Sequence, residues 1–192
     1  SVFQDFEGLI QLMGGKEAFE KKIDKVFEMP PLFDDSYYGF TIHEIREMQI
    51  MDMGNYAHGN QPIQHLIYLY NYASKPHKAQ AKLREVMEKL YAPTPDGYCG
   101  DEDNGQTSAW YVFSALGFYP VTPANDTYIL GNPLFKTVTL QLPEGKKFLI
   151  KSVARNSTDN LVENVQLNGK KIEGFEVPFE AFRENGKMTF FR

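Results

Sequence analysis

The chain has 192 residues and a net charge of −5, and 42% of its residues are apolar, 23% charged and 14% aromatic. This composition is typical of an ordered globular protein of one domain or two small ones, and its mild acidic excess disfavours a nucleic-acid partner, which requires clustered Lys and Arg. The single cysteine, Cys99, excludes an internal disulfide, and no apolar run is long enough to predict a membrane span.

Helical spacing of apolar residues dominates the first two-thirds of the chain. The sequence begins without Met and without a signal-peptide pattern, so we expect the chain to be part of a longer one. The second and third predicted helices form a hairpin, and the fourth is apolar nearly all round, which predicts burial on most sides. Such helix pairs favour a bundle or toroid whose loops gather at one rim. The four predicted helices are residues 16–28, 62–73, 78–90 and 106–116.

The pattern changes to alternation of apolar and polar residues after Pro120. Residues 143–145 and 168–169 have turn composition and separate apolar runs, as hairpin connections do. We therefore expect a mainly α chain with a C-terminal β part: residues 1–120 helical, and residues 121–192 a small antiparallel β unit. Two triplets, beginning at Asn125 and Asn156, also fit the N-glycosylation pattern.

An acidic loop, residues 100–106 (GDEDNGQ), precedes the last predicted helix. Three successive carboxylates repel one another unless a cation, a helix N-terminus or a catalytic role compensates them. Its glycine and its twelfth residue do not match an EF-hand. The loop is thus either a solvated helix cap or a site of chemistry.

Two weaker polar clusters precede this loop. The amide oxygens of Asn60 and Gln61 are suitable ligands for hard cations, although Asn beside Pro commonly forms a turn. His43 and Glu44 can contact a sugar or a metal, but adjacent residues of a helix point in different directions, so a surface pair is the simpler interpretation.

Taken together, these segments resemble glycoside hydrolase family 92, the calcium-dependent α-mannosidases, over most of the chain. That family is exo-acting and inverting, and it combines an N-terminal β domain with an (α/α)6 barrel. The resemblance implies that this chain supplies the later helices of a partial barrel. The segments that carry it are residues 41–48, 54–65, 68–72, 100–106 and 108–120.

The resemblance implies a role for seven residues. Asp103 is expected to be the general base that activates water, with Asp101 assisting, while Glu102 lies between them in an extended stretch and points away. His43 and Glu44 match positions that face the bound mannose. Calcium is expected near three further residues, Asn60, Gln61 and Glu47, although some family members have Glu where this chain has Gln61.

The implied activity is release of terminal mannose, with an α-1,2 linkage expected, by a secreted or periplasmic bacterial enzyme acting on mannose-containing glycans. Inversion requires a second, distant carboxyl group as acid. In the family this acid lies upstream of the segment matching this chain, so the chain alone is expected to be inactive without the missing N-terminal part. The alternatives are an (α/α)6 glycosidase or phosphorylase of other specificity and a non-catalytic carbohydrate-binding module.

Overall fold

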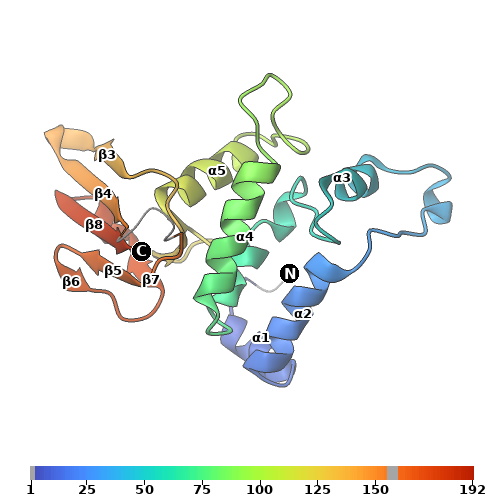
Figure 1. Cartoon of the computed structure of the whole chain (residues 1–192), viewed down its shortest axis with the longest axis horizontal. Helices are drawn as coiled ribbons and strands as arrows, with labels where there is room; N and C mark the ends of the chain where they lie inside the picture. Colours follow the sequence, from blue (N-terminus) through green and yellow to red (C-terminus); the bar gives the residue numbers. More distant parts are fainter. Residues whose placement is uncertain (1–2, 155–159) are drawn as a thin grey trace.

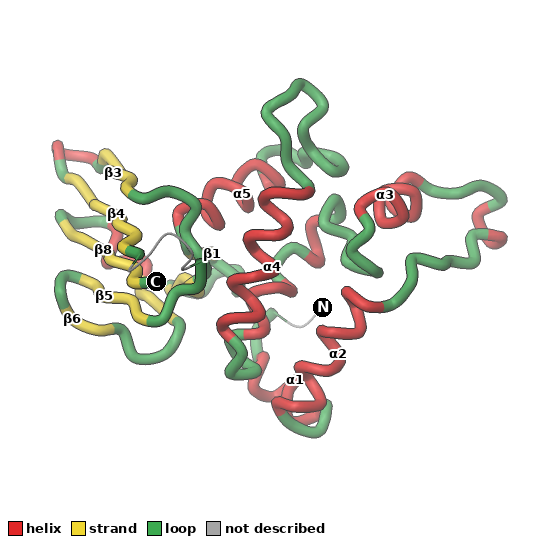
Figure 2. The backbone as a smooth tube through the Cα atoms, viewed as in Figure 1, coloured by secondary structure: helices red, strands yellow, loops and turns green. Residues whose placement is uncertain are grey.

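The computed structural model describes residues 3–154 and 160–192, with helices in the first part of the chain and two β-sheets in the second (Figures 1 and 2). The predicted glycosylation triplet at Asn156 lies outside the described residues. The α-helices are α1 (Phe6–Leu12), α2 (Lys16–Glu28), α3 (His43–Met51), α4 (Pro76–Lys89) and α5 (Gln106–Leu116), and the 3-10 segments are η1 (Ser36–Tyr38), η2 (Gln61–Ile63), η3 (Leu66–Tyr70), η4 (Pro143–Gly145) and η5 (Phe179–Phe182). The strands are β1 (Phe118–Tyr119), β2 (Thr127–Leu130), β3 (Thr137–Gln141), β4 (Lys147–Val153), β5 (Asn164–Leu167), β6 (Lys170–Lys171), β7 (Glu176–Pro178) and β8 (Gly186–Phe191).

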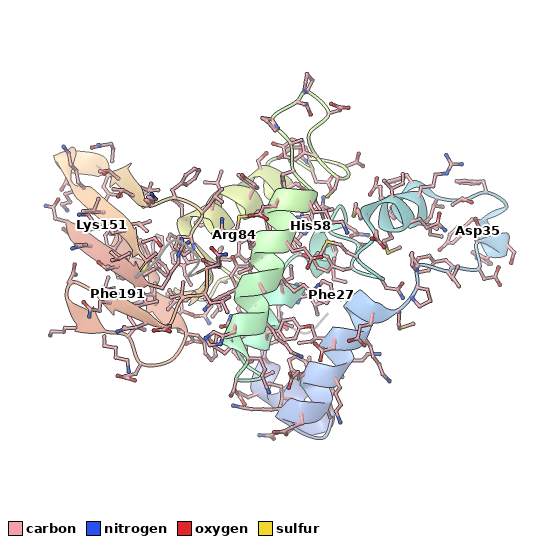
Figure 3. All side chains as sticks on the ribbon, in the orientation of Figure 1. Phe27, Asp35, His58, Arg84, Lys151 and Phe191 are labelled. Atoms are coloured by element: carbon pink, nitrogen blue, oxygen red, sulfur yellow. The ribbon has the colours of Figure 1, made fainter. Side chains whose placement is uncertain are left out.

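The predicted bounds of α2 are confirmed. Gly15 precedes it with φ at 102°, a conformation that costs glycine little, and Phe19 and Ile23 face the core. Beyond Glu28, the chain leaves the helix at Met29 in an extended conformation and projects away from the body before returning as α3 (Figure 1). Asp35 lies on the far part of this excursion (Figure 3).

The predicted helix over residues 62–73 is wrong, because the segment forms 3-10 turns, η2 and η3. Backbone hydrogen bonds span three residues, from the N–H of Tyr68 to His65 and from that of Asn71 to Tyr68. Residues 67–70 are all buried and Pro62 is exposed, but such a pattern of burial does not determine whether backbone bonds span three or four residues. The apolar residues of the segment do face the core, as their spacing indicated.

The helices α4 and α5 carry the centre of the helical core (Figure 1). Leu83 and Val86 of α4 are fully buried, and so is Trp110 of α5. The prediction that α5 is covered on most sides is only partly right, since Val112 is 55% exposed. The bounds of α5 agree with the prediction.

The β part contains a three-stranded sheet, β1-β2-β7, and a five-stranded sheet, β3-β4-β8-β5-β6. The two predicted hairpin turns are confirmed, since η4 joins antiparallel β3 and β4 and a turn at Asn168-Gly169 joins β5 and β6. The expectation of purely antiparallel pairing is wrong. β4 and β8 run parallel, with Ile150 opposite Met188, because the long connection between them carries β5 to β7.

Two hydrophobic cores divide the described residues. One gathers the helices around Tyr68, Leu83 and Trp110, and the other lies within the β part around Phe148 and Phe190. Side chains after Tyr119, including Val121 and Ile129, join the helical core, so packing crosses the predicted boundary at residue 120, and that boundary stays a prediction. No helix among the described residues is long and apolar enough to cross a membrane.

Candidate functional site

Polar side chains from three segments meet where the loop between α4 and α5 approaches the start of α3. His43 Nε2 lies 3.8 Å from the Asp101 carboxylate and 3.5 Å from that of Glu44. Gln61 donates a hydrogen bond from Nε2 to the Asp101 carbonyl at 3.4 Å. With Glu47, described next, these five residues form what we call the rim cluster.

Glu47 is held over a close backbone contact. A Cβ atom added to Gly100 would lie 2.7 Å from the Gly59 Cα, so this position requires glycine, whereas one added to Gly59 would lie 2.6 Å from the Glu47 carboxylate, which would have to move aside. Burial raises the pKa of Glu47, the negative charges of Asp101 and Glu44 raise it further, and His43 opposes them. Among the described residues, none donates a hydrogen bond to this carboxylate.

Asp103 lies apart from these contacts. Its side chain is exposed, and none of the hydrogen bonds or ion pairs of the rim cluster, as far as residues 3–154 and 160–192 go, involves it. Its φ of 52° is followed by 55° at Asn104 and 98° at Gly105, a left-handed run that Asp and Asn tolerate better than most residues. Such strained turns are often found at functional sites.

Glu102 does not lie in an extended stretch pointing away, as expected, because the left-handed turn folds it back onto α5. Its carboxylate accepts hydrogen bonds from the Gly105 N–H at 2.6 Å and from the Ser108 hydroxyl at 2.6 Å. These bonds, the one from Ser108 foremost, lower the pKa of Glu102. The cap interpretation of the acidic loop is therefore correct for the Glu102 carboxylate.

The expected calcium ligands are only partly brought together. Gln61 belongs to the rim cluster, whereas Asn60 is exposed and lines an apolar pocket of about 510 Å³ against α2. No group of three or more His, Cys, Asp or Glu side chains in the described part of the chain is arranged to hold a metal. The donors nevertheless suit calcium, which prefers oxygen, and the partly buried Glu47 carboxylate is the kind of group that a cation would compensate.

A buried polar network under the rim cluster was not foreseen from the sequence. Thr107 and Gln64 are fully buried, and their side chains are hydrogen bonded at 3.3 Å. His58, also fully buried, lies between the hydroxyls of Tyr56 and Tyr91 at 2.8 and 2.7 Å. Figure 3 shows His58 between α4 and α3. The available signal was a set of polar residues at positions that the apolar pattern assigns to the core.

Burial lowers the pKa of His58 to about 3, so this imidazole is neutral at physiological pH. The hydrogen-bond partners of His58 determine which of its two ring nitrogens carries the proton. Tyr91 donates to the Thr107 carbonyl, at 3.2 Å, and a carbonyl can only accept, so Tyr91 receives its other bond from His58 Nε2–H. His58 Nδ1 is then the acceptor for Tyr56.

Comparison with known proteins identifies the family that this chain resembles. The model of the glycosyl hydrolase family 92 catalytic domain matches residues 1–191. A curated relative, an uncharacterized secreted glycosidase of Arthroderma benhamiae, is 24% identical over 97% of this chain and 21% of its own length.

Solved structures of high similarity come from Bacteroides thetaiotaomicron. A family 92 inverting mannosidase of strain VPI-5482 is 50% identical, with a TM-score of 0.79, over 99% of this chain and 26% of that one. A family 92 α-mannosidase is 33% identical, with a TM-score of 0.81, over 98% of this chain and 23% of that one. The chain thus spans about a quarter of the length of the proteins it matches.

Proposed function

The chain belongs to glycosyl hydrolase family 92, and from this premise we propose that it is part of a longer inverting exo-α-mannosidase that releases terminal mannose from glycans. The observation that carries the proposal is the rim cluster, in which carboxylates, an imidazole and an amide from three segments converge. The helices of this chain would belong to an (α/α)6 barrel completed by residues outside it. An α-1,2 linkage is the first to test.

The proposed reaction uses exposed carboxylates of the acidic loop. Asp103, assisted by Asp101, takes a proton from a water molecule while the oxygen of that water attacks the anomeric carbon. An acid from outside this chain protonates the departing glycosidic oxygen on the opposite face of the sugar. Both aspartates are exposed and can be reached by substrate. His43 and Glu44 would bind mannose hydroxyls and hold the sugar in register with the attacking water.

Calcium is the proposed cofactor, because the family is generally calcium-dependent and the donors near the rim cluster offer oxygen atoms. Glu47 and Gln61, with Asn60 from the neighbouring surface, would contribute ligands. When bound, the ion would supply positive charge that orients sugar hydroxyls and favours an oxocarbenium-like ring. Secretion, periplasmic in a bacterium, is proposed from the secreted relative.

The longer protein should release mannose from an aryl α-mannoside and from α-1,2-mannobiose in calcium buffer, and a chelator should abolish this release reversibly. Turnover that is unaffected by exhaustive chelation would contradict the calcium assignment. Turnover that requires inorganic phosphate would identify a phosphorylase instead. Mannose binding without hydrolysis of any mannoside would identify a carbohydrate-binding module.

A further inference from the structure

Thr107, in the first turn of α5, links the acidic loop to the core through four hydrogen bonds. Its hydroxyl donates to the Asp101 carbonyl at 3.1 Å and accepts from Gln64 Nε2 at 3.3 Å. Its N–H donates to the Glu102 carbonyl at 3.2 Å, and its carbonyl accepts from Tyr91 at 3.2 Å. A side chain of 0% exposure with every polar group engaged has little freedom to rearrange.

The amide of Gln64 has one orientation that fits its surroundings. Its nitrogen donates to the His58 carbonyl at 3.1 Å and to Thr107, while its oxygen accepts from Gln106 Nε2 at 3.2 Å. The reversed amide would set oxygen against the His58 carbonyl, so it is excluded. Because Gln64 donates to the Thr107 hydroxyl, that hydroxyl is left to donate its own proton to Asp101.

A second chain of hydrogen bonds also ends at Thr107, and the donor and acceptor of each of its bonds are determined. The proton order from Tyr56 through His58 and Tyr91 ends on the Thr107 carbonyl. Two directed hydrogen-bond chains therefore converge on Thr107, and Thr107 in turn contacts the backbone of Asp101 and Glu102.

We propose that Thr107 is a positioning residue: it fixes the Asp101 peptide, and with it the direction of the Asp101 carboxylate toward His43 and the setting of the left-handed turn that carries Asp103. The Asp101 carbonyl receives Thr107 and Gln61 together, so the loop is held from the core and from the rim. This inference rests on the proposed function, and it assigns to Thr107 no contact with substrate.

The test compares two substitutions in the longer protein. Thr107→Val keeps the shape and removes the hydroxyl, whereas Thr107→Ser keeps the hydroxyl. We expect Thr107→Val to lower kcat by about 10- to 100-fold with KM changed much less, as supporting residues of a site typically do. Thr107→Ser should retain kcat within about threefold of the parent protein.

Thr189→Val is the matched control, because Thr189 is also buried but lies on β8, in the other hydrophobic core's sheet. It should leave kcat unchanged even if the melting temperature falls. If Thr107→Val does not fold, Tyr91→Phe, which removes only the bond to the Thr107 carbonyl and the one to His58, should lower kcat in the same direction by a smaller factor. Unchanged kcat in Thr107→Val, or equal loss in Thr107→Ser, would overturn the proposal.

Hydrogen exchange separates this proposal from the proposed function. In Thr107→Val the amides of residues 101–107 should exchange faster than in Thr107→Ser and Thr189→Val, whether or not the protein cleaves mannosides. Unchanged exchange in Thr107→Val would overturn positioning by Thr107. A parent protein without mannosidase activity would overturn the proposed function while leaving this comparison readable.

Discussion

Asp103→Asn in the longer protein should lower kcat on α-mannosides by about 10²- to 10⁴-fold, the range in which a positioned general base contributes. An amide cannot accept the proton that the attacking water loses. Sugar binding should persist, because the proposed mannose contacts come from His43 and Glu44. Steady-state kinetics and calorimetric titration with mannose measure both effects.

Glu102→Gln is the matched control for this substitution, since it removes the neighbouring carboxylate of the same loop. Glu102 accepts hydrogen bonds at the start of α5, so its loss should lower the melting temperature and leave kcat close to that of the parent. Asp101→Asn should lower kcat, as expected of an assisting group. If Glu102→Gln were as inactive as Asp103→Asn, general disruption of the loop would explain both, and the assignment of the base would be wrong.

Trp110→Ala should destabilise the helical core by about 3–5 kcal/mol, the usual cost of removing a buried tryptophan side chain. Trp110 is fully buried, stacks on Tyr91 at 6.0 Å between ring centroids, and donates from Nε1 to the Gln64 carbonyl at 3.0 Å. Its loss therefore leaves a cavity and an unpaired acceptor beneath the rim cluster. Native-state hydrogen exchange of α4 and α5 measures the change in opening free energy without requiring two-state unfolding of a long chain.

Val112→Ala on the same helix is the control, because Val112 is 55% exposed. Substitutions of exposed residues usually change stability by less than about 0.5 kcal/mol. If Trp110→Ala lowered the opening free energy no more than Val112→Ala, the central place given to Trp110 in the core would be contradicted.

Local signals predicted the elements whose ends are encoded nearby. The glycine pair at 14–15 and the prolines at 30–31 bound α2, and the turns at 143–145 and 168–169 join hairpins. The 3-10 segments at 61–70 were missed because apolar spacing reports which residues face the core but not whether backbone bonds span three or four residues. The parallel pairing of β4 with β8 joins strands far apart in sequence, and no local pattern encodes it.

The sequence predicted the residues of the site that lie in recognisable motifs, but not those whose contacts depend on the fold. Long motifs marked Asp101, His43, Glu44 and Gln61, and the structure brings these residues together. The fold of Glu102 onto α5 depends on a left-handed run of backbone that residue types alone do not fix. Thr107 was missed because its role arises from partners that lie 6 and 43 residues away in the chain.

The stereochemistry of the first product is the most direct measure of the proposed chemistry. Proton NMR of an aryl α-mannoside freshly mixed with the longer protein should show β-mannose before any α-mannose, because water activated by the acidic loop attacks the face opposite the departing oxygen. Initial appearance of α-mannose, or no sugar released in the presence of calcium, would contradict this account.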